Sequence, residues 1–226
     1  MDLKISALFD LSHTLAGDYL SQFEYPWQAL DGIKELILSL GPTLGEDYEE
    51  RAPQVWVHKT AKVFPSAWLA APCIIGPDTE VRHCAFIRGS ALVGAGCVVG
   101  NSVELKNVIL FDNVQTPHYN YVGDSILGYK SHMGAGSITS NIKSDKTLVV
   151  VKNGDETIET GRKKFGAMLG DFVEVGCNSV LNPGTVVGPR SNIYPVSCVR
   201  GVIPADSIYK TGGVIVPRDT HRVKGD

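Results

Sequence analysis

Two cationic side chains and one imidazole lie at spacings that are multiples of six. Arg88 and Lys106 are 18 residues apart, and His118 follows Lys106 by 12 residues. Guanidinium and ammonium groups bind phosphate oxygens through charge-assisted hydrogen bonds, and an imidazole accepts a proton near neutral pH. The three residues therefore indicate a groove for a dianionic ligand such as a phosphate, with an imidazole beside it, if the fold brings them together.

The fold is indicated by an apolar residue that returns every six positions. This series runs without a miss through Val57, Val63, Leu69, Ile75, Val81, Ile87, Val93, Val99, Leu105 and Phe111. A period of six fits neither an α-helix nor an ordinary strand. It is typical of a hexapeptide β-helix, in which each hexapeptide supplies one strand and one corner and three of them close a coil of about 18 residues. An ordinary β-sandwich is the less favoured alternative.

The same period places the three candidate residues. Arg88 and Lys106 each follow an inward residue, so we expect them one above the other on one face. Two stacked cations repel each other, and a dianion such as phosphate would relieve this repulsion. His118 follows Pro117, which keeps the inward phase, so we expect its side chain to point outward on an adjoining face. Each residue alone is a common surface residue, but the joint spacing favours a shared groove.

The repeat falters after Phe111 and then returns. The hexapeptide from Val122 to Ile126 is one residue short, which indicates a bulge or a site, and residues 141–165 break the pattern altogether. The inward series resumes at regular spacing with Leu169, Val175, Leu181, Val187, Ile193 and Val199. We therefore predict six to seven coils.

The predicted fold is all-β, a parallel β-helix over residues 53–203 with a small N-terminal helical cap. Residues 1–52 carry a helical stripe that Gly41 and Pro42 end, and we expect this segment to cover the open first coil. Residues 141–165 read as a projecting loop with a hairpin around Asn153-Gly154-Asp155. Residues 204–226 form a tail with one strand-like run, Val214–Val216, and a solvated basic end.

Composition excludes several classes of protein. A net charge of −3 and a pI near 6.1 argue against a nucleic-acid binder. The first ten residues have no long apolar core and no apolar stretch reaches 18 residues, so we expect neither a signal peptide nor a membrane span but a soluble, cytoplasmic protein. The five cysteines lack C-x-x-C pairing, and Cys73 and Cys97 occupy small inward positions, so we expect reduced core thiols.

At these residues the sequence resembles a known family. The segments that carry the likeness are Phe86–Gly89, Gly100–Asn107, His118–Ser125 and Gly134–Asn141. They are similar to the acetyltransferase half of bifunctional N-acetylglucosamine-1-phosphate uridylyltransferase/glucosamine-1-phosphate acetyltransferase, and to the C-terminal half of archaeal sugar-1-phosphate nucleotidylyltransferases. The resemblance covers about residues 55–205. It implies a left-handed parallel β-helix, a homotrimer, and acetyl-CoA bound between subunits.

The resemblance also implies roles for five of these residues. Arg88 and Lys106 would bind the sugar phosphate, and His118 would be the general base. Tyr121 and Asn141 would contact the sugar. Together they imply an N-acetyltransferase that acts on glucosamine-1-phosphate or galactosamine-1-phosphate in UDP-N-acetylglucosamine biosynthesis.

Other matches are looser or depart from the family. Ala135, Cys177 and Pro195 would line the acetyl-CoA site, with Cys177 in place of a serine. Lys146 matches a substrate-binding lysine on a loop that here is one residue shorter. His132 stands where the bacterial enzyme has a substrate-contacting asparagine, which leaves the identity of the sugar open.

No glycine-rich nucleotide-binding segment precedes the β-helix, so the resemblance implies no nucleotidyltransferase activity in this chain; a separate nucleotidyltransferase could supply that step. The second interpretation is a non-catalytic assembly or regulatory protein related to UDP-N-acetylglucosamine pyrophosphorylase. The third is a metal-dependent hydratase on the same scaffold, which needs three converging histidines. His83 and His118 are 35 residues apart, near two coils, but no third histidine lies within a few residues of His118, so we expect no metal.

Overall fold

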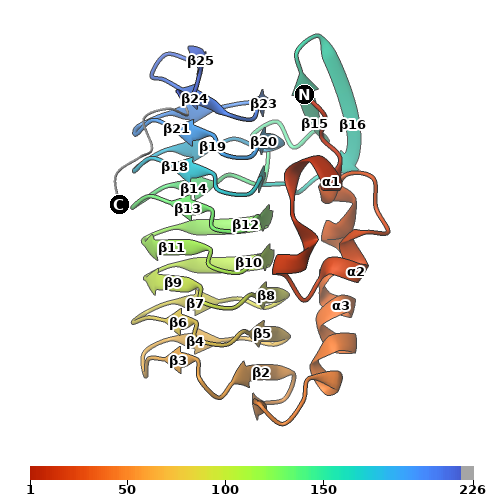
Figure 1. The fold of residues 1–226 in the computed structure, drawn as a ribbon, viewed down its shortest axis with the longest axis vertical. Helices are drawn as coiled ribbons and strands as arrows, with labels where there is room; N and C mark the ends of the chain where they lie inside the picture. The colour runs from red at the N-terminus through yellow and green to blue at the C-terminus, as the bar shows by residue number, and fades with distance from the viewer. Residues whose placement is uncertain (220–226) are drawn as a thin grey trace.

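A computed structural model describes residues 1–219 of the chain. Its main body is a stack of parallel coils, and a helical N-terminal segment runs along one side of this stack (Figure 1). Each coil contributes a short strand to each of three faces, and strands of successive coils pair in parallel. The stacked coils confirm the β-helix that the six-residue period predicts.

The three faces are numbered in chain order. Face 1 contains β2 (Val55–His58), β5 (Cys73–Ile75), β8 (Ala91–Val93), the second halves of β10 (Glu104–Leu110) and β12 (Tyr121–Leu127), β17 (Ala167–Leu169), β20 (Thr185–Val187) and β23 (Val202–Ile203). Face 2 contains β3 (Lys62–Val63), β6 (Glu80–Val81), β9 (Val98–Asn101), β11 (Gln115–His118), β13 (His132–Met133), β18 (Glu174–Val175), β21 (Asn192–Ile193) and β24 (Ser207–Tyr209). Face 3 contains β4 (Trp68–Leu69), β7 (Phe86–Ile87), the first halves of β10 and β12, β14 (Ile138–Thr139), β19 (Val180–Leu181) and β22 (Cys198–Val199).

In two successive coils, the corner between face 3 and face 1 is one residue shorter than the same corner of the preceding coil, which lies between β7 and β8. Their corner residues, Asn107 and Asp124, have positive φ angles of 54° and 49°. As a result, β10 and β12 continue through the corner and contribute to both faces. The sequence pattern shows one of these slips, near Val122, and misses the one at Asn107.

The missed slip changes the inward residues that follow it. The prediction that Phe111 and Pro117 point inward is wrong, because Leu110 pairs with Val93 and Thr116 with Val99. Phe111 is buried instead against Phe9 of the N-terminal segment, with ring centroids 5.1 Å apart. His118 is exposed as expected. The reason is not the predicted one: His118 is the second residue after the inward Thr116, and it begins a corner.

The N-terminal segment does not cover the first coil as predicted. It lies along face 1, whose outward side chains are also apolar and buried: Ile74, Leu92, Ile109, Ile126, Met168 and Val186. The covering elements are α1 (Ile5–Leu8), η1 (Leu11–His13), α2 (Gly17–Leu20), η2 (Pro26–Gly32), α3 (Ile33–Leu40) and η3 (Gly41–Thr43). Because burying one such side chain is worth about 1.5–3 kcal/mol, an apolar outer column stabilises the segment along the stack rather than over its end.

A short antiparallel strand extends one face at each end of the stack. β1 (Tyr48–Ala52) pairs with β2, and β25 (Ile215–Pro217) pairs with β24. Both pairings occupy strand edges that would otherwise be open to other chains. The strand-like run predicted at Val214–Val216 corresponds to β25, and the predicted solvated basic end lies outside the described residues.

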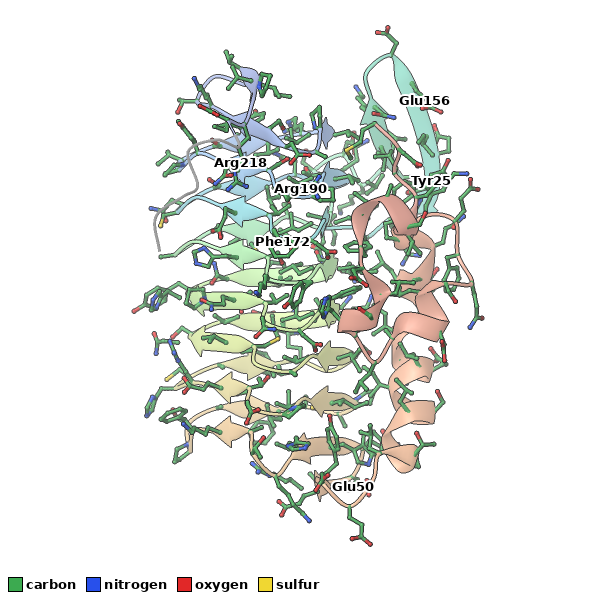
Figure 2. All side chains as sticks on the ribbon, in the orientation of Figure 1. Tyr25, Glu50, Glu156, Phe172, Arg190 and Arg218 are labelled. Carbon is green, nitrogen blue, oxygen red and sulfur yellow. The ribbon has the colours of Figure 1, made fainter. Side chains whose placement is uncertain are left out.

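A hairpin of β15 (Val149–Asn153) and β16 (Glu156–Arg162) projects from a corner between face 3 and face 1. Glu156 lies near its far tip, at the opposite end of the molecule from Glu50 (Figure 2). The terminal amino group of Met1 donates a hydrogen bond to Asn153 Oδ1 at 3.0 Å. The hairpin and the N-terminal segment are therefore fastened to each other as well as to the stack.

Candidate functional site

Asp124 is the centre of a polar network at the second short corner. Its carboxylate is only 3% exposed. Oδ1 accepts hydrogen bonds from Lys106 Nζ at 2.8 Å and from Asn107 Nδ2 at 2.9 Å, and Oδ2 accepts one from Asn141 Nδ2 at 2.5 Å. A buried carboxylate is stable only with such partners, so Asp124 fixes Lys106 and Asn141 relative to each other.

Arg88 and Lys106 are neighbours on successive coils, as the spacing predicts. The Arg88 amide donates to the carbonyl oxygen of Leu105, directly before Lys106. Each cation has its own carboxylate, because Arg88 Nη1 lies 2.7 Å from Glu104 Oε1 and Lys106 contacts Asp124. The hydrogen bond and the charge of Glu104 raise the pKa of Arg88. The expected repulsion between two unpaired cations is therefore absent.

Tyr121 and Asn141 join the same network from face 3. Asn141 Nδ2 lies 3.1 Å from Tyr121 Oη. Burial, together with the negative charges of Asp124 and Glu104, raises the pKa of Tyr121, so this hydroxyl stays protonated and can donate a hydrogen bond. A Cβ at Gly123 would overlap Tyr121 Oη, so a larger residue there would displace this hydroxyl from the network.

His118 lies at the other edge of face 3, at the corner between β11 and β12. The buried side chain of Asn120 fixes this corner: its Oδ1 accepts from the His118 amide at 3.2 Å, and its Nδ2 donates to the carbonyl oxygens of Gly134 at 2.8 Å and Ser137 at 3.0 Å. His118 and Tyr121 therefore flank one rigid corner. Face 3 lies between this imidazole and the Asp124 network.

The three residues assigned to acetyl-CoA stack on the same corner as His118, one per coil. The His118 carbonyl oxygen accepts from the amide of Gly136, next to Ala135. Asn178, next to Cys177, donates its amide to Ala135, and Val196, next to Pro195, donates its amide to Cys177. The Cys177 thiol position is exposed. The ladder of hydrogen bonds thus aligns His118, Ala135, Cys177 and Pro195 in one column, which we call the corner column.

Two predicted substrate residues lie away from this group within one chain. His132 is on face 2, where its Nδ1 lies 2.8 Å from Glu174 Oε2. Lys146 is exposed on the loop before the hairpin, and no hydrogen bond or ion pair in residues 1–219 links its side chain to the network. A single chain therefore brings together Arg88, Lys106, Tyr121 and Asn141, but not these two.

Three polar residues of the site were not singled out from the sequence. Asp124 and Asn120 lie at corners within the motif from His118 to Ser125, and Asn107 lies at the corner that ends the segment Gly100–Asn107. The available signal was the short hexapeptide around Asp124, because a slip in so regular a repeat indicates a bulge or a site.

Within residues 1–219 no group of three or more His, Cys, Asp or Glu side chains has an arrangement that could hold a metal ion. No helix in this range is long and apolar enough to cross a bilayer. Cys73 and Cys97 are buried free thiols whose pKa burial raises to about 12. They are core residues without nucleophilic character.

The match to a known protein family lies in the repeat region. Residues 69–193, more than half of the chain, match the GMPPB C-terminal domain. The bifunctional sugar-1-phosphate nucleotidylyltransferase/acetyltransferase of Sulfurisphaera tokodaii is 27% identical over 82% of this chain and 47% of its own length. The bifunctional protein GlmU of Methanocaldococcus jannaschii is 31% identical over 87% of this chain and 49% of its own. The chain thus spans about half the length of these relatives.

Among solved structures, the match to the N-acyltransferase AntD from Bacillus cereus, determined with dTDP and coenzyme A, covers 75% of this chain and 83% of that chain. The sequence identity is 15% and the TM-score is 0.38.

Proposed function

Because the chain belongs to the GMPPB C-terminal domain family and its relatives include bifunctional nucleotidylyltransferase/acetyltransferases, we propose that it is an acetyl-CoA-dependent N-acetyltransferase acting on an amino-sugar 1-phosphate. The observation that carries this proposal is the corner column. In this column His118 lies one coil before Ala135, and Cys177 and Pro195 follow on the next two coils.

His118 is the general base of the proposed reaction. The neutral amine of the sugar attacks the thioester carbonyl carbon, His118 accepts the proton that the amine loses, and the C–S bond breaks to release coenzyme A, whose sulfur takes up a proton. Backbone amides at the corners are the donors for the oxyanion. In residues 1–219 no hydrogen bond engages the imidazole nitrogens of His118, so the ring is available to a substrate.

The acceptor is proposed to bind on face 3. Lys106 and Arg88 hold the phosphate, and Tyr121 and Asn141 contact the sugar, as the polar network around Asp124 supports. Phosphate oxygens accept charge-assisted hydrogen bonds from such cations. Arg88 would leave Glu104 in part to do so.

A homotrimer would complete this site. Trp68 and Phe86 stand in the same outward column of face 3 as Glu104 and Tyr121, and they are 67% and 41% exposed. Exposed aromatic side chains beside a polar site are typical of interfaces. A second copy packed on this face would cover them and could bring its own His132 and Lys146 to the substrate.

A non-catalytic assembly role is the second candidate. It is favoured by the carboxylates that already neutralise Arg88 and Lys106, because paired cations can serve the fold alone.

A thiol-release assay with acetyl-CoA separates the two functions. The acceptors are glucosamine-1-phosphate, galactosamine-1-phosphate and free glucosamine. The enzyme proposal expects release of coenzyme A with at least one sugar phosphate and a much lower kcat/KM with free glucosamine. Release no faster than in the absence of acceptor, with all three sugars, would refute it and favour the assembly role.

A further inference from the structure

An open cleft lies where the N-terminal segment, the short corners and the end of β16 meet. Its volume is about 490 Å³, within the range of small-molecule sites. Its walls come from three parts of the chain: Asp31 and Lys34 of η2 and α3, Lys106 and Asp124 of the corners, and Lys163 and Lys164 at the end of the hairpin. It is distinct from the corner column and touches the Asp124 network only through the corner residues.

The cleft has a positive excess in a chain whose net charge is −3. Two of its three acids are occupied, since Asp124 accepts from Lys106 and Asp31 is bound by Arg162. Among residues 1–219 no ion pair involves Lys34, Lys163 or Lys164, all of which are exposed. Three ammonium groups with one remaining acid, Glu35, suit an anion of two negative charges.

Contacts between the walls hold the cleft in shape. The guanidinium of Arg162 binds both carboxylate oxygens of Asp31 at 2.7 Å, and its side chain is only 11% exposed. This two-pronged contact fastens the end of β16 to η2, directly before Lys163 and Lys164. On the floor, Asn107 Nδ2 donates to the Leu30 carbonyl oxygen at 3.1 Å. Fixed walls lower the entropy cost of binding a ligand.

We propose that this cleft binds the phosphoryl group of a small anionic ligand, with Lys106 on its floor and Lys34, Lys163 and Lys164 around it. If the proposed acetyltransferase function holds, on which this identification of the ligand rests, the phosphoryl group is that of the amino-sugar 1-phosphate. Lys106 then contacts the phosphate from the cleft side, and the N-terminal segment and the hairpin supply the other cations. None of these three lysines lies in the segments that carry the family resemblance.

Isothermal titration calorimetry of the full chain tests the site without acyl transfer. The probes are inorganic phosphate, glucosamine-1-phosphate and free glucosamine, at low ionic strength because exposed charges are screened by salt. The two phosphates should bind and compete with each other, whereas free glucosamine should show no detectable binding. Competition identifies the shared phosphoryl group as the part that is recognised.

Variants that remove the same charge inside and outside the cleft distinguish a specific phosphate site from non-specific electrostatic attraction. Lys163→Ala/Lys164→Ala should weaken binding of inorganic phosphate by about tenfold or more, and Lys34→Ala, on the opposite wall, should weaken it several-fold. The control Lys59→Ala/Lys152→Ala removes the same charge, and Lys152 lies on the same hairpin outside the cleft; it should change the affinity less than twofold. Circular dichroism and thermal melting verify that each variant is folded, and Lys34→Ala keeps the test valid if the hairpin variant does not fold.

Absence of phosphate binding at millimolar concentration, or equal losses in the cleft and control variants, would overturn the proposal. Failure of the acetyltransferase function has a different signature. In that case inorganic phosphate would still bind in a manner that depends on Lys34, Lys163 and Lys164, but no sugar phosphate would release thiol from acetyl-CoA.

Discussion

Replacing Asp124 with Asn tests the polar network most severely. The carboxylate accepts three hydrogen bonds, from Lys106, Asn107 and Asn141. An asparagine keeps one carbonyl oxygen for the first two donors, but its own NH₂ group faces the NH₂ group of Asn141. The substitution therefore replaces the ion pair with Lys106 by a charged–neutral hydrogen bond, makes the bond from Asn107 a neutral one, and removes the third.

The cost follows from typical hydrogen-bond energies. A hydrogen bond to a charged group contributes about 1.5–3 kcal/mol and a neutral one about 0.5–1.5 kcal/mol. Two bonds weakened by about 1 kcal/mol each and one bond to a charged group lost give a decrease of about 4 kcal/mol in the free energy of unfolding. For a chain of this size, such a loss lowers Tm by about 8–16 °C.

The assay is urea and thermal unfolding of wild type and Asp124→Asn, followed by circular dichroism. Asp78→Asn is the matched control, because Asp78 is also an aspartate with positive φ at a corner, but it is exposed. The control should stay within about 0.5 kcal/mol of wild type. A change of that small size in Asp124→Asn would refute the reasoning that Asp124 organises the site.

Three further results are expected. Lys106→Ala should raise the KM for the sugar phosphate about tenfold to a hundredfold, the equivalent of a charged hydrogen bond, and leave the KM for acetyl-CoA nearly unchanged; steady-state kinetics with an unchanged sugar-phosphate KM would contradict this role. Burial raises the pKa of Asp171 above its ordinary 3.8, so between the two values the folded state retains a proton that the unfolded state releases. The stability of wild type relative to Asp171→Asn should therefore fall as pH rises from below 3.8 through the raised pKa. Urea unfolding of both proteins across this range measures the difference, and a difference that stays flat or rises would contradict the prediction. Light scattering at micromolar concentration should give the mass of a trimer, and a monomer would exclude a site shared between copies.

The stacking of Arg88 under Lys106 could be predicted from the sequence, because inward residues such as Ile87 and Leu105 recur at a fixed period. The position of the first short corner could not, because Leu110 and Phe111 are both apolar and either satisfies the pattern. The sequence contains a signal from which the location of the N-terminal segment along face 1 could have been predicted. A buried triplet such as Cys73-Ile74-Ile75 has an apolar residue on its outward side as well, which requires a cover.

The site itself was predicted only in part. The motif around His118 and Tyr121 identifies the corner between β11 and β12, where the candidate site is proposed. The role of Asp124 depends on donors from different coils, Lys106 and Asn141, and no local pattern links them. Lys163 lies in a segment without repeats, and only the contact between β16 and the N-terminal segment brings it to the cleft.

The central claim is that His118 is the base of an acyl transfer, and the turnover of His118→Ala tests it most directly. The matched control is His83→Ala, because His83 is an exposed histidine at the same corner two coils earlier, linked to His118 through the carbonyl and amide contacts of Asn101, Ser102 and Tyr119. Loss of a general base lowers kcat by about 10²–10⁴. With glucosamine-1-phosphate and acetyl-CoA as substrates, His118→Ala should show this loss with little change in KM or Tm, and His83→Ala should retain wild-type turnover. A loss smaller than about fivefold in a folded His118→Ala protein would contradict the account.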